Sequence, residues 1–300
     1  MAELSKVATI NHVHWTADPS AAVQETAILA LERGDVLFFP GLAFETSSDD
    51  LRVFSPDIVG SAKNVGFDPG TGTVGGTLLT GEPLKSLTGV LDRYSRRALA
   101  LIDGLLPSYR GRTAIGRTSF RPIEIAGRKT SWRKDDTRLH IDSFPASPVL
   151  GRRILRVFTN VNPERRARTW RIGEDFETVA RRFASSLRPP LPGSAQLLHW
   201  LRLTKARRSL YDAMMLQLHD RMKADGKYQA GCPQVTVDFP AGSTWVAFTD
   251  QVSHAAMAGQ YQLEQTLLLP VGAMRDERRS PLRVLERLKG RPLAPTSPPR

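Results

Sequence analysis

Residues 151–162, Gly-Arg-Arg-Ile-Leu-Arg-Val-Phe-Thr-Asn-Val-Asn, alternate between two kinds of side chain, and this alternation strongly constrains the fold. The odd positions from Leu155 to Val161 are apolar or β-branched, whereas the even positions include Arg156 and Asn160. Because successive side chains of a strand point to opposite faces, the segment predicts a strand with one apolar face and one polar face. We expect the polar face to line the interior of a β-barrel or sandwich.

Strand-like and helix-like segments follow one another in blocks along the chain. Helices are expected at 21–31 and 84–106, strands at 35–40, 113–125 and 151–161, helices at 172–187 and 195–224, and strands at 235–239, 244–248 and 262–269. This order predicts an α+β chain with a mainly β core, flanking helices and a helical insert at about 170–225, and it disfavours an alternating βαβ sheet. Residues 60–81 are rich in glycine and threonine and are expected to form a loop. We expect one domain over residues 1–289 and a proline-rich disordered tail over 290–300.

A metal site is predicted by His140-Ile141-Asp142, which places an imidazole and a carboxylate two residues apart. On a strand both side chains would project to the same face, so one metal ion could bind both. His254 is the candidate third ligand, since it follows the expected strand at 244–248 and a short polar turn. Two histidines and one carboxylate leave open positions on iron for a chelating cosubstrate and oxygen, although a zinc hydrolase could use the same ligand types.

The other four histidines are weaker candidates for metal ligands. His199 and His219 lie in helical stretches and are interpreted as residues of the core edge or surface. His12 and His14 have no acidic residue nearby in the sequence and are interpreted as part of a plain strand.

Arg156 is the candidate anion-binding residue of the interior. A buried guanidinium without an anion would be costly, and the distal carboxylate of 2-oxoglutarate would supply that anion. Residues 255–274 contain no lysine or arginine, which also favours Arg156. Thr137 and Asn160 are candidate helpers in binding the cosubstrate. The alternative is that Arg156 forms a salt bridge with a structural acidic residue.

The net charge of +12 comes largely from arginine, because only nine of the 42 basic residues are lysine. Guanidinium groups match carboxylate and phosphate oxygens, so the excess suggests a polyanionic partner. The single cysteine, Cys232, excludes an intrachain disulfide and favours a reducing compartment. We expect neither a secretory signal nor a membrane-spanning segment, since no apolar run has the required length.

Several segments of the chain resemble the bacterial Kdo 3-hydroxylases, where Kdo is 3-deoxy-D-manno-oct-2-ulosonic acid. These are residues 75–79, 93–97, 132–145, 151–163 and 170–176. The resemblance implies a double-stranded β-helix, that is, a jelly-roll or cupin-like barrel. It implies an iron(II)/2-oxoglutarate-dependent dioxygenase that uses O2, hydroxylates C3 of Kdo in the lipid A inner core, and releases succinate and CO2. His140, Asp142 and His254 match the iron ligands of that family.

Two alternatives to Kdo hydroxylation remain open from the sequence. One is a 2-oxoglutarate oxygenase that acts on another acidic sugar or on a protein. The other is a non-catalytic basic nucleic-acid-binding protein, although no nucleic-acid-binding motif is found and no nucleic acid is expected.

A lipid-anchored substrate implies a peripheral contact with the inner face of the cytoplasmic membrane. Residues 280–289 predict a short helix, with Ser280 as N-cap and an apolar stripe of Leu282, Leu285 and Leu288 among basic residues. This helix could lie on the membrane surface or pack on the protein.

Overall fold

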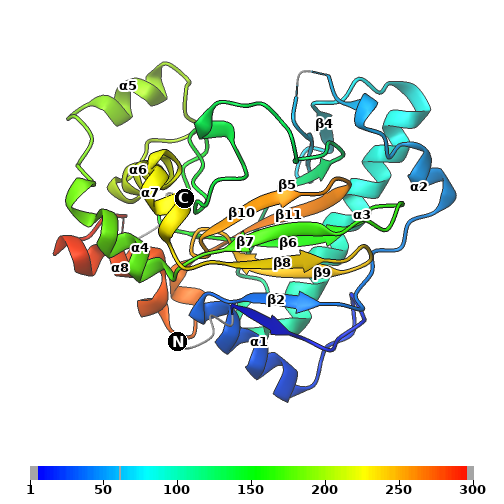
Figure 1. Cartoon of the computed structure of the whole chain (residues 1–300), viewed down its shortest axis with the longest axis horizontal. Helices are drawn as coiled ribbons and strands as arrows, with labels where there is room; N and C mark the ends of the chain where they lie inside the picture. Colours follow the sequence, from blue (N-terminus) through cyan, green and yellow to red (C-terminus); the bar gives the residue numbers. More distant parts are fainter. Residues whose placement is uncertain (1–5, 61, 296–300) are drawn as a thin grey trace.

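The computed structural model describes residues 6–60 and 62–295, and its core is formed by two β-sheets (Figure 1). The larger sheet has eight strands in the order β1-β2-β9-β6-β11-β5-β3-β4, and the smaller has the order β10-β7-β8. The strands are β1 Val7–Thr9, β2 Val36–Phe39, β3 Val65–Asp68, β4 Thr73–Gly75, β5 Ala114–Arg121, β6 Arg153–Asn160, β7 Arg168–Ile172, β8 Val235–Phe239, β9 Thr244–Phe248, β10 His254–Ala258 and β11 Gln262–Leu269. Within the described ranges the strands do not close into one hydrogen-bonded barrel. The prediction of a mainly β core of the jelly-roll type is confirmed.

Helices α1 (Ala21–Arg33) and α3 (Gly81–Leu105) cover the outer face of the large sheet (Figure 1). The odd-numbered face of β6 packs against them, and Leu155 and Val157 are fully buried there. Tyr94 of α3 donates a hydrogen bond of 3.1 Å to the carbonyl of Val157. The apolar face predicted from residues 151–162 is therefore the side that binds the helices.

The even-numbered face of β6 points toward the small sheet. Phe158 stacks on Trp245 of β9 with ring centroids 5.4 Å apart, and its ring also contacts Trp170 of β7. This aromatic cluster fills one part of the space between the sheets, and polar residues of the same faces line the rest. The polar face of β6 therefore lies in the interior, as its sequence predicted.

Five helices gather at one end of the sheets, four of them around a common apolar core (Figure 1). They are α4 Phe176–Phe183, α5 Ser194–Trp200, α6 Leu210–Ala224, α7 Gly226–Gly231 and α8 Pro281–Lys289, and α5 contributes no buried residue. The helical insert begins at Phe176, because Trp170 and Ile172 lie on β7, where they pair with Val237 and Val235 of β8.

The C-terminal helix α8 begins after Ser280, whose hydroxyl accepts a hydrogen bond from the Arg283 amide, as a helix N-cap does. Its apolar stripe packs inward: Leu285 is 0% exposed and Leu282 is 7% exposed. Of the two arrangements open from the sequence, packing on the protein is the one observed. Within the expected tail over 290–300, Leu293 is buried in the same core, and residues 296–300 lie outside the described ranges.

The loop expected at 60–81 contains a short hairpin, β3–β4, at the edge of the large sheet. Gly76 ends it with a φ of 80°, and a Cβ there would lie 2.5 Å from the Asn64 carbonyl oxygen. The prediction of a plain loop was wrong here, because strands rich in glycine have little intrinsic preference for the extended state and depend on pairing with β5. Helix α2 (Ser48–Arg52) lies between α1 and this hairpin in the sequence. In the described ranges, no helix is both long and apolar enough to span a membrane.

Candidate metal centre

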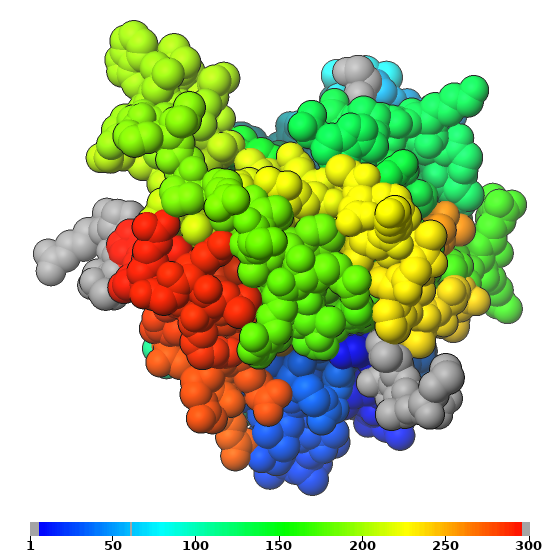
Figure 2. Space-filling view, turned by 60° about the vertical axis from the view of Figure 1, so that its left-hand side comes forward, coloured from blue at the N-terminus to red at the C-terminus, as the bar shows by residue number. Residues whose placement is uncertain are grey.

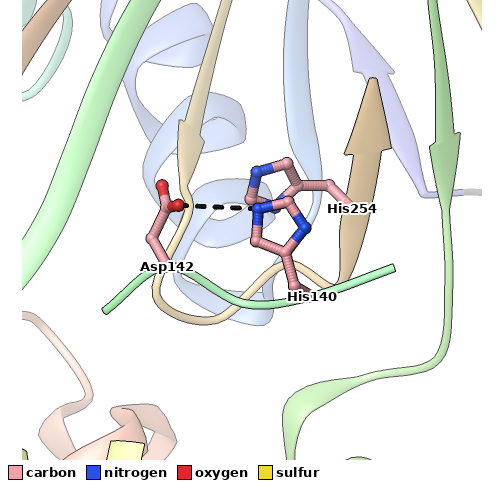
Figure 3. Close-up of side chains that lie close together, drawn as sticks. All are labelled: His140, Asp142 and His254. Carbon is pink, nitrogen blue, oxygen red and sulfur yellow. Dashed lines mark ion pairs between the residues drawn. The ribbon is translucent and has the colours of Figure 1, made fainter. Parts of the chain in front are cut away.

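The backbone brings His140 and His254 together directly, although they are far apart in the sequence (Figure 3). The His140 amide donates to the His254 carbonyl at 3.0 Å, and the His254 amide donates back at 2.8 Å. The Asp142 amide donates to the Thr249 carbonyl at 2.8 Å, and this bond attaches the end of the motif to the residue that follows β9. The motif lies in an extended segment rather than in a regular strand, and the isolated bridge between His140 and His254 joins this segment to β10.

Alternation along 139–142 decides which side chains reach the site. Leu139 and Ile141 are fully buried in the apolar core under the helices, so His140 and Asp142 point the other way, toward the interior of the sheets. Gln229 of α7 holds this segment extended, since its amide side chain accepts from the Leu139 amide and donates to the Leu139 carbonyl. The helical insert thus sets the position of the motif.

The three side chains can offer one ligand atom each within 4.8 Å of one another. The Nδ1 of His140 bonds to the Arg138 carbonyl and the Nδ1 of His254 to the Val252 carbonyl, both at 2.8 Å. Because a carbonyl can only accept, Nδ1 carries the proton in each ring, and the lone pair of Nε2 remains for a metal. Asp142 Oδ2 is buried and has no hydrogen-bond partner in the part of the chain that the structure describes. The residues therefore fit a divalent metal held by two imidazoles and one carboxylate.

The electrostatics of the site favour the protonation states that a metal requires. Burial lowers the pKa of His140 and of His254 below the usual 6.5, and for His140 the charge of His254 adds to this effect. For Asp142, burial acts to raise the pKa, but Arg156 together with His254, His140 and a hydrogen bond from Thr249 outweighs it and holds the pKa well below 3.8. Neutral imidazoles and an ionised carboxylate are the ligand forms of these residues.

Two aromatic neighbours of the histidines were missed by the sequence interpretation. Trp170 of β7 stacks on His254 with ring centroids 5.0 Å apart, and so fixes the plane of that ring. His219 of α6 lies edge-on to His140 at 5.3 Å, so it borders the site rather than a remote surface. The helical period placed His219 on α6 correctly but could not indicate which element α6 faces.

Arg156 extends from β6 into the interior and bridges two carboxylates. Its Nη1 lies 3.3 Å from Asp142 and 3.0 Å from Glu264 of β11, while its Nε is buried and has no hydrogen-bond partner among the residues described. Glu264 also accepts a hydrogen bond of 2.9 Å from Arg121 of β5. Glu264 and Arg121 were not identified from the sequence. Two guanidinium groups thus share one glutamate beside the candidate metal ligands.

The two candidate helpers of Arg156 have other partners. Asn160 donates to the carbonyls of Arg166 and Phe239 and accepts from the Asn162 amide, so its side chain is used in fixing the end of β6. The hydroxyl of Thr137 donates to Asp135 at 2.7 Å. The donors of both side chains are committed to structural hydrogen bonds.

A further arginine with an unpaired donor lies in the same interior. Arg168 of β7 is 2% exposed, and its Nε has no hydrogen-bond partner among the described residues, whereas its Nη1 donates to the Gly259 carbonyl. Burial, with repulsion from Arg121, lowers the pKa of Arg168 to about 9. The interior between the sheets therefore holds two guanidinium Nε donors, of Arg156 and Arg168, that have no hydrogen-bond partner among the described residues.

Comparison with known proteins gives a family match and close structural relatives. The family model for 3-deoxy-D-manno-oct-2-ulosonic acid (Kdo) hydroxylase matches residues 14–292. A crystal structure of the Kdo hydroxylase KdoO, a non-heme Fe(II) alpha-ketoglutarate-dependent dioxygenase, in complex with cobalt(II) is 46% identical, with a TM-score of 0.95 over 98% of this chain and 99% of that one.

A second KdoO structure, in complex with alpha-ketoglutarate and Fe(III), is 45% identical with a TM-score of 0.94 over the same shares of the two chains. A third, in complex with succinate and Fe(III), has the same identity, TM-score and coverage. No match was found among curated proteins.

Proposed function

The chain belongs to the Kdo hydroxylase family, and from this membership we propose that it hydroxylates C3 of Kdo in the lipid A inner core. It is an iron(II)/2-oxoglutarate-dependent dioxygenase. One oxygen atom of O2 enters the Kdo product and the other enters succinate, while 2-oxoglutarate loses CO2. The observation that carries the proposal is the His-Asp-His cluster inside a fold that matches KdoO along nearly its whole length.

We propose that His140, Asp142 and His254 hold the iron, with the two Nε2 atoms and one carboxylate oxygen as ligands. The Nδ1 hydrogen bonds support this assignment, because they fix both rings in the tautomer that leaves Nε2 free. When bound there, iron supplies the site for binding and activating O2 beside the substrate. The stack of Trp170 on His254 would keep that ring from turning.

We propose that Arg156 binds the distal carboxylate of 2-oxoglutarate. Its buried, unpartnered Nε and its position beside Asp142 support this role. A carboxylate at Nε would satisfy a donor whose burial is otherwise costly, and charge-assisted hydrogen bonds of this kind are the strong ones. Arg168 offers a second unpaired donor in the same interior.

For the substrate, we propose an acidic sugar presented at a membrane surface on the cytoplasmic side. The carboxylate of Kdo and the phosphates of lipid A are anionic, and the net charge of +12 is complementary to them. Because the described helices cannot span a bilayer, we propose a peripheral contact.

Mass spectrometry of lipid A core oligosaccharide tests the proposed reaction. Cells that express the chain should carry one additional oxygen atom on Kdo, whereas cells that express His140→Ala at the same level should not. Incorporation of label from ¹⁸O₂ identifies O2 as the source of that oxygen. An unchanged Kdo mass, with the oxygen found instead on another sugar or on a protein, would refute the assignment of substrate while leaving the oxygenase assignment in place.

A further inference from the structure

Helix α5 and its flanking turns form a lobe, Arg188–Arg208, that stands away from the rest of the molecule (Figures 1 and 2). Figure 2 shows it as the yellow-green projection at the upper left. Five large apolar side chains of this lobe are exposed to solvent. They are Leu191 (80% exposed), Leu197 (54%), Trp200 (79%), Leu201 (50%) and Leu203 (60%). Apolar exposure clustered in one projection marks an interaction surface.

The lobe is fixed to the protein at both ends. At its start, the backbone amide and carbonyl of Arg188 both bond to the side chain of Gln217 on α6. At its end, the Lys205 amide donates to the Ala146 carbonyl at 2.8 Å, and Arg208 donates to the Pro145 carbonyl at 2.5 Å. These contacts hold the lobe in one position, so the exposure of its apolar side chains is a feature of the fold.

The charges of the lobe are all of one sign. Residues 188–209 contain no aspartate or glutamate. Four exposed basic side chains surround the apolar ones: Arg188, Arg202, Lys205 and Arg207. None of the four forms a salt bridge with an acidic residue in the described ranges, so their charge is available to a partner.

Helix α8 is also basic and apolar, but acidic residues pair with its arginines. Arg283 pairs with Glu277 and Glu286, and Arg287 lies 3.5 Å from Glu177. In its leucine stripe, Leu282 and Leu285 are buried in the core and Leu288 packs against it partly buried. A cationic apolar surface is therefore offered by the lobe and not by α8.

A recess of about 480 Å³ lies on the lobe, lined by Gln196, His199, Trp200, Arg202 and Arg207. Two guanidinium groups beside an indole suit an anionic headgroup attached to an apolar chain. The boundary between headgroups and acyl chains presents phosphates beside apolar groups, and these residues are complementary to both.

We infer that this lobe docks on an anionic lipid bilayer, with its leucines and Trp200 in the boundary between headgroups and acyl chains and its arginines on lipid phosphates. Tryptophan is enriched at that boundary because its ring is apolar and its N–H is polar. The basic residues would strengthen binding to anionic lipid and make it dependent on salt.

Two other partners fit the lobe less well. A second copy of the chain that met this surface symmetrically would bring unpaired arginines against arginines. A nucleic acid would satisfy the charges but would leave Leu191, Leu197 and Leu203 without an apolar partner. Both partners are included as outcomes of the test.

Docking through the lobe would also orient the metal centre. The end of the lobe bonds to Pro145 and Ala146, which follow the candidate ligand Asp142 closely in the sequence. A bilayer under the lobe would therefore hold that loop near the headgroups. This part of the inference rests on the proposed function, whereas bilayer binding itself does not.

Co-sedimentation with vesicles tests the binding, using the full chain without iron or 2-oxoglutarate. We expect the protein to bind vesicles of phosphatidylethanolamine and phosphatidylglycerol, and to bind phosphatidylcholine vesicles weakly. The double substitution Trp200→Ser with Leu203→Ser should lower the partition coefficient about tenfold or more. Leu29→Ser with Leu51→Ser, which changes two exposed leucines outside the lobe, should leave it unchanged.

Two charge-reversal variants test whether the arginines of the lobe attract anionic lipid. Arg202→Glu with Arg207→Glu should abolish the preference for anionic vesicles, whereas Arg97→Glu with Arg165→Glu makes the same change of net charge outside the lobe and should preserve it.

Brominated lipid should quench the fluorescence of Trp200, so Trp200→Phe should reduce quenching while binding persists. Far-UV circular dichroism confirms folding of each variant.

The inference is overturned if the two lobe variants bind vesicles as well as the unmodified chain, or if their loss of binding equals that of the controls. It is also overturned if sedimentation equilibrium shows a dimer that the lobe variants convert to monomer, or if the lobe binds DNA and not vesicles. Turnover is measured separately, so a chain that binds vesicles but does not oxidise Kdo refutes the proposed function alone.

Discussion

Substitution of Arg156 by methionine removes the guanidinium from the interior and keeps an apolar side chain of similar reach. Arg156 Nη1 lies 3.0 Å from Glu264 and 3.3 Å from Asp142, and all three side chains are largely buried. Breaking a buried ion pair costs about 3–5 kcal/mol. Because Glu264 keeps its bond to Arg121, we expect the lower end, a loss of about 3 kcal/mol in the free energy of unfolding.

The same substitution should weaken binding of 2-oxoglutarate. A hydrogen bond to a charged group contributes about 1.5–3 kcal/mol. Since about 1.4 kcal/mol corresponds to a factor of ten, the KM for 2-oxoglutarate should rise about ten- to a hundredfold. Initial rates of succinate formation at varied 2-oxoglutarate measure this change, and urea denaturation followed by circular dichroism measures the loss of stability.

Arg121→Met is the matched control, because Arg121 binds the same Glu264 but forms no ion pair with Asp142 in the described ranges. It should lower stability by a similar amount and leave the KM for 2-oxoglutarate within about twofold. If Arg121→Met raises the KM as much as Arg156→Met does, the interior arginines act as one structural network. If neither substitution raises it, Arg156 does not bind the cosubstrate.

The remaining predictions concern the metal ligands and the C-terminal helix. His140→Ala should abolish turnover and the visible absorption of a cobalt(II)-loaded protein, with an unchanged far-UV circular dichroism spectrum; a normal cobalt spectrum would remove His140 from the ligand set. Because burial lowers the pKa of His140 and His254 below 6.5, the neutral form of both rings predominates at pH 6.5. The midpoint of the fall in cobalt affinity on acidification should therefore lie below pH 6.5, where protons compete for the rings; a midpoint at or above 6.5 would contradict the buried environment. Leu285→Ala should cost about 2–5 kcal/mol of unfolding free energy, since this side chain is 0% exposed, and should leave vesicle binding of the folded protein unchanged. Weaker vesicle binding by folded Leu285→Ala would instead give α8 a part in the membrane contact.

Local patterns in the sequence were sufficient to locate much of the framework. The alternation in 151–162 gave both faces of β6 correctly, and the helical period of 84–106 located α3. The capping residue Ser280 marked the start of α8. These features depend on neighbours within a few residues, which is why a single sequence reveals them.

Strands β7 and β10 were not predicted as separate elements, because their pairing is long-range. Residues 170–172 continue into a helical period and were assigned to the insert, yet β7 pairs with β8 and β10. Glu264 shows the same limit. It could be recognised as polar in a strand, but only the adjacency of β11 to β5 and β6 places it between Arg121 and Arg156.

The residues of the candidate site could be proposed from the sequence, whereas their electrostatic surroundings could not. His140 and Asp142 are two residues apart, so strand geometry alone predicts a shared ligand direction. Which basic residues are free to bind an anion is decided by distant acidic partners. The arginines of α8 and of the α5 lobe look alike in sequence, but folding places glutamates beside Arg283 and Arg287 and none beside Arg202 and Arg207 among the residues the structure describes. Burial and ion pairing depend on contacts between remote segments, and so only the tertiary structure could decide them.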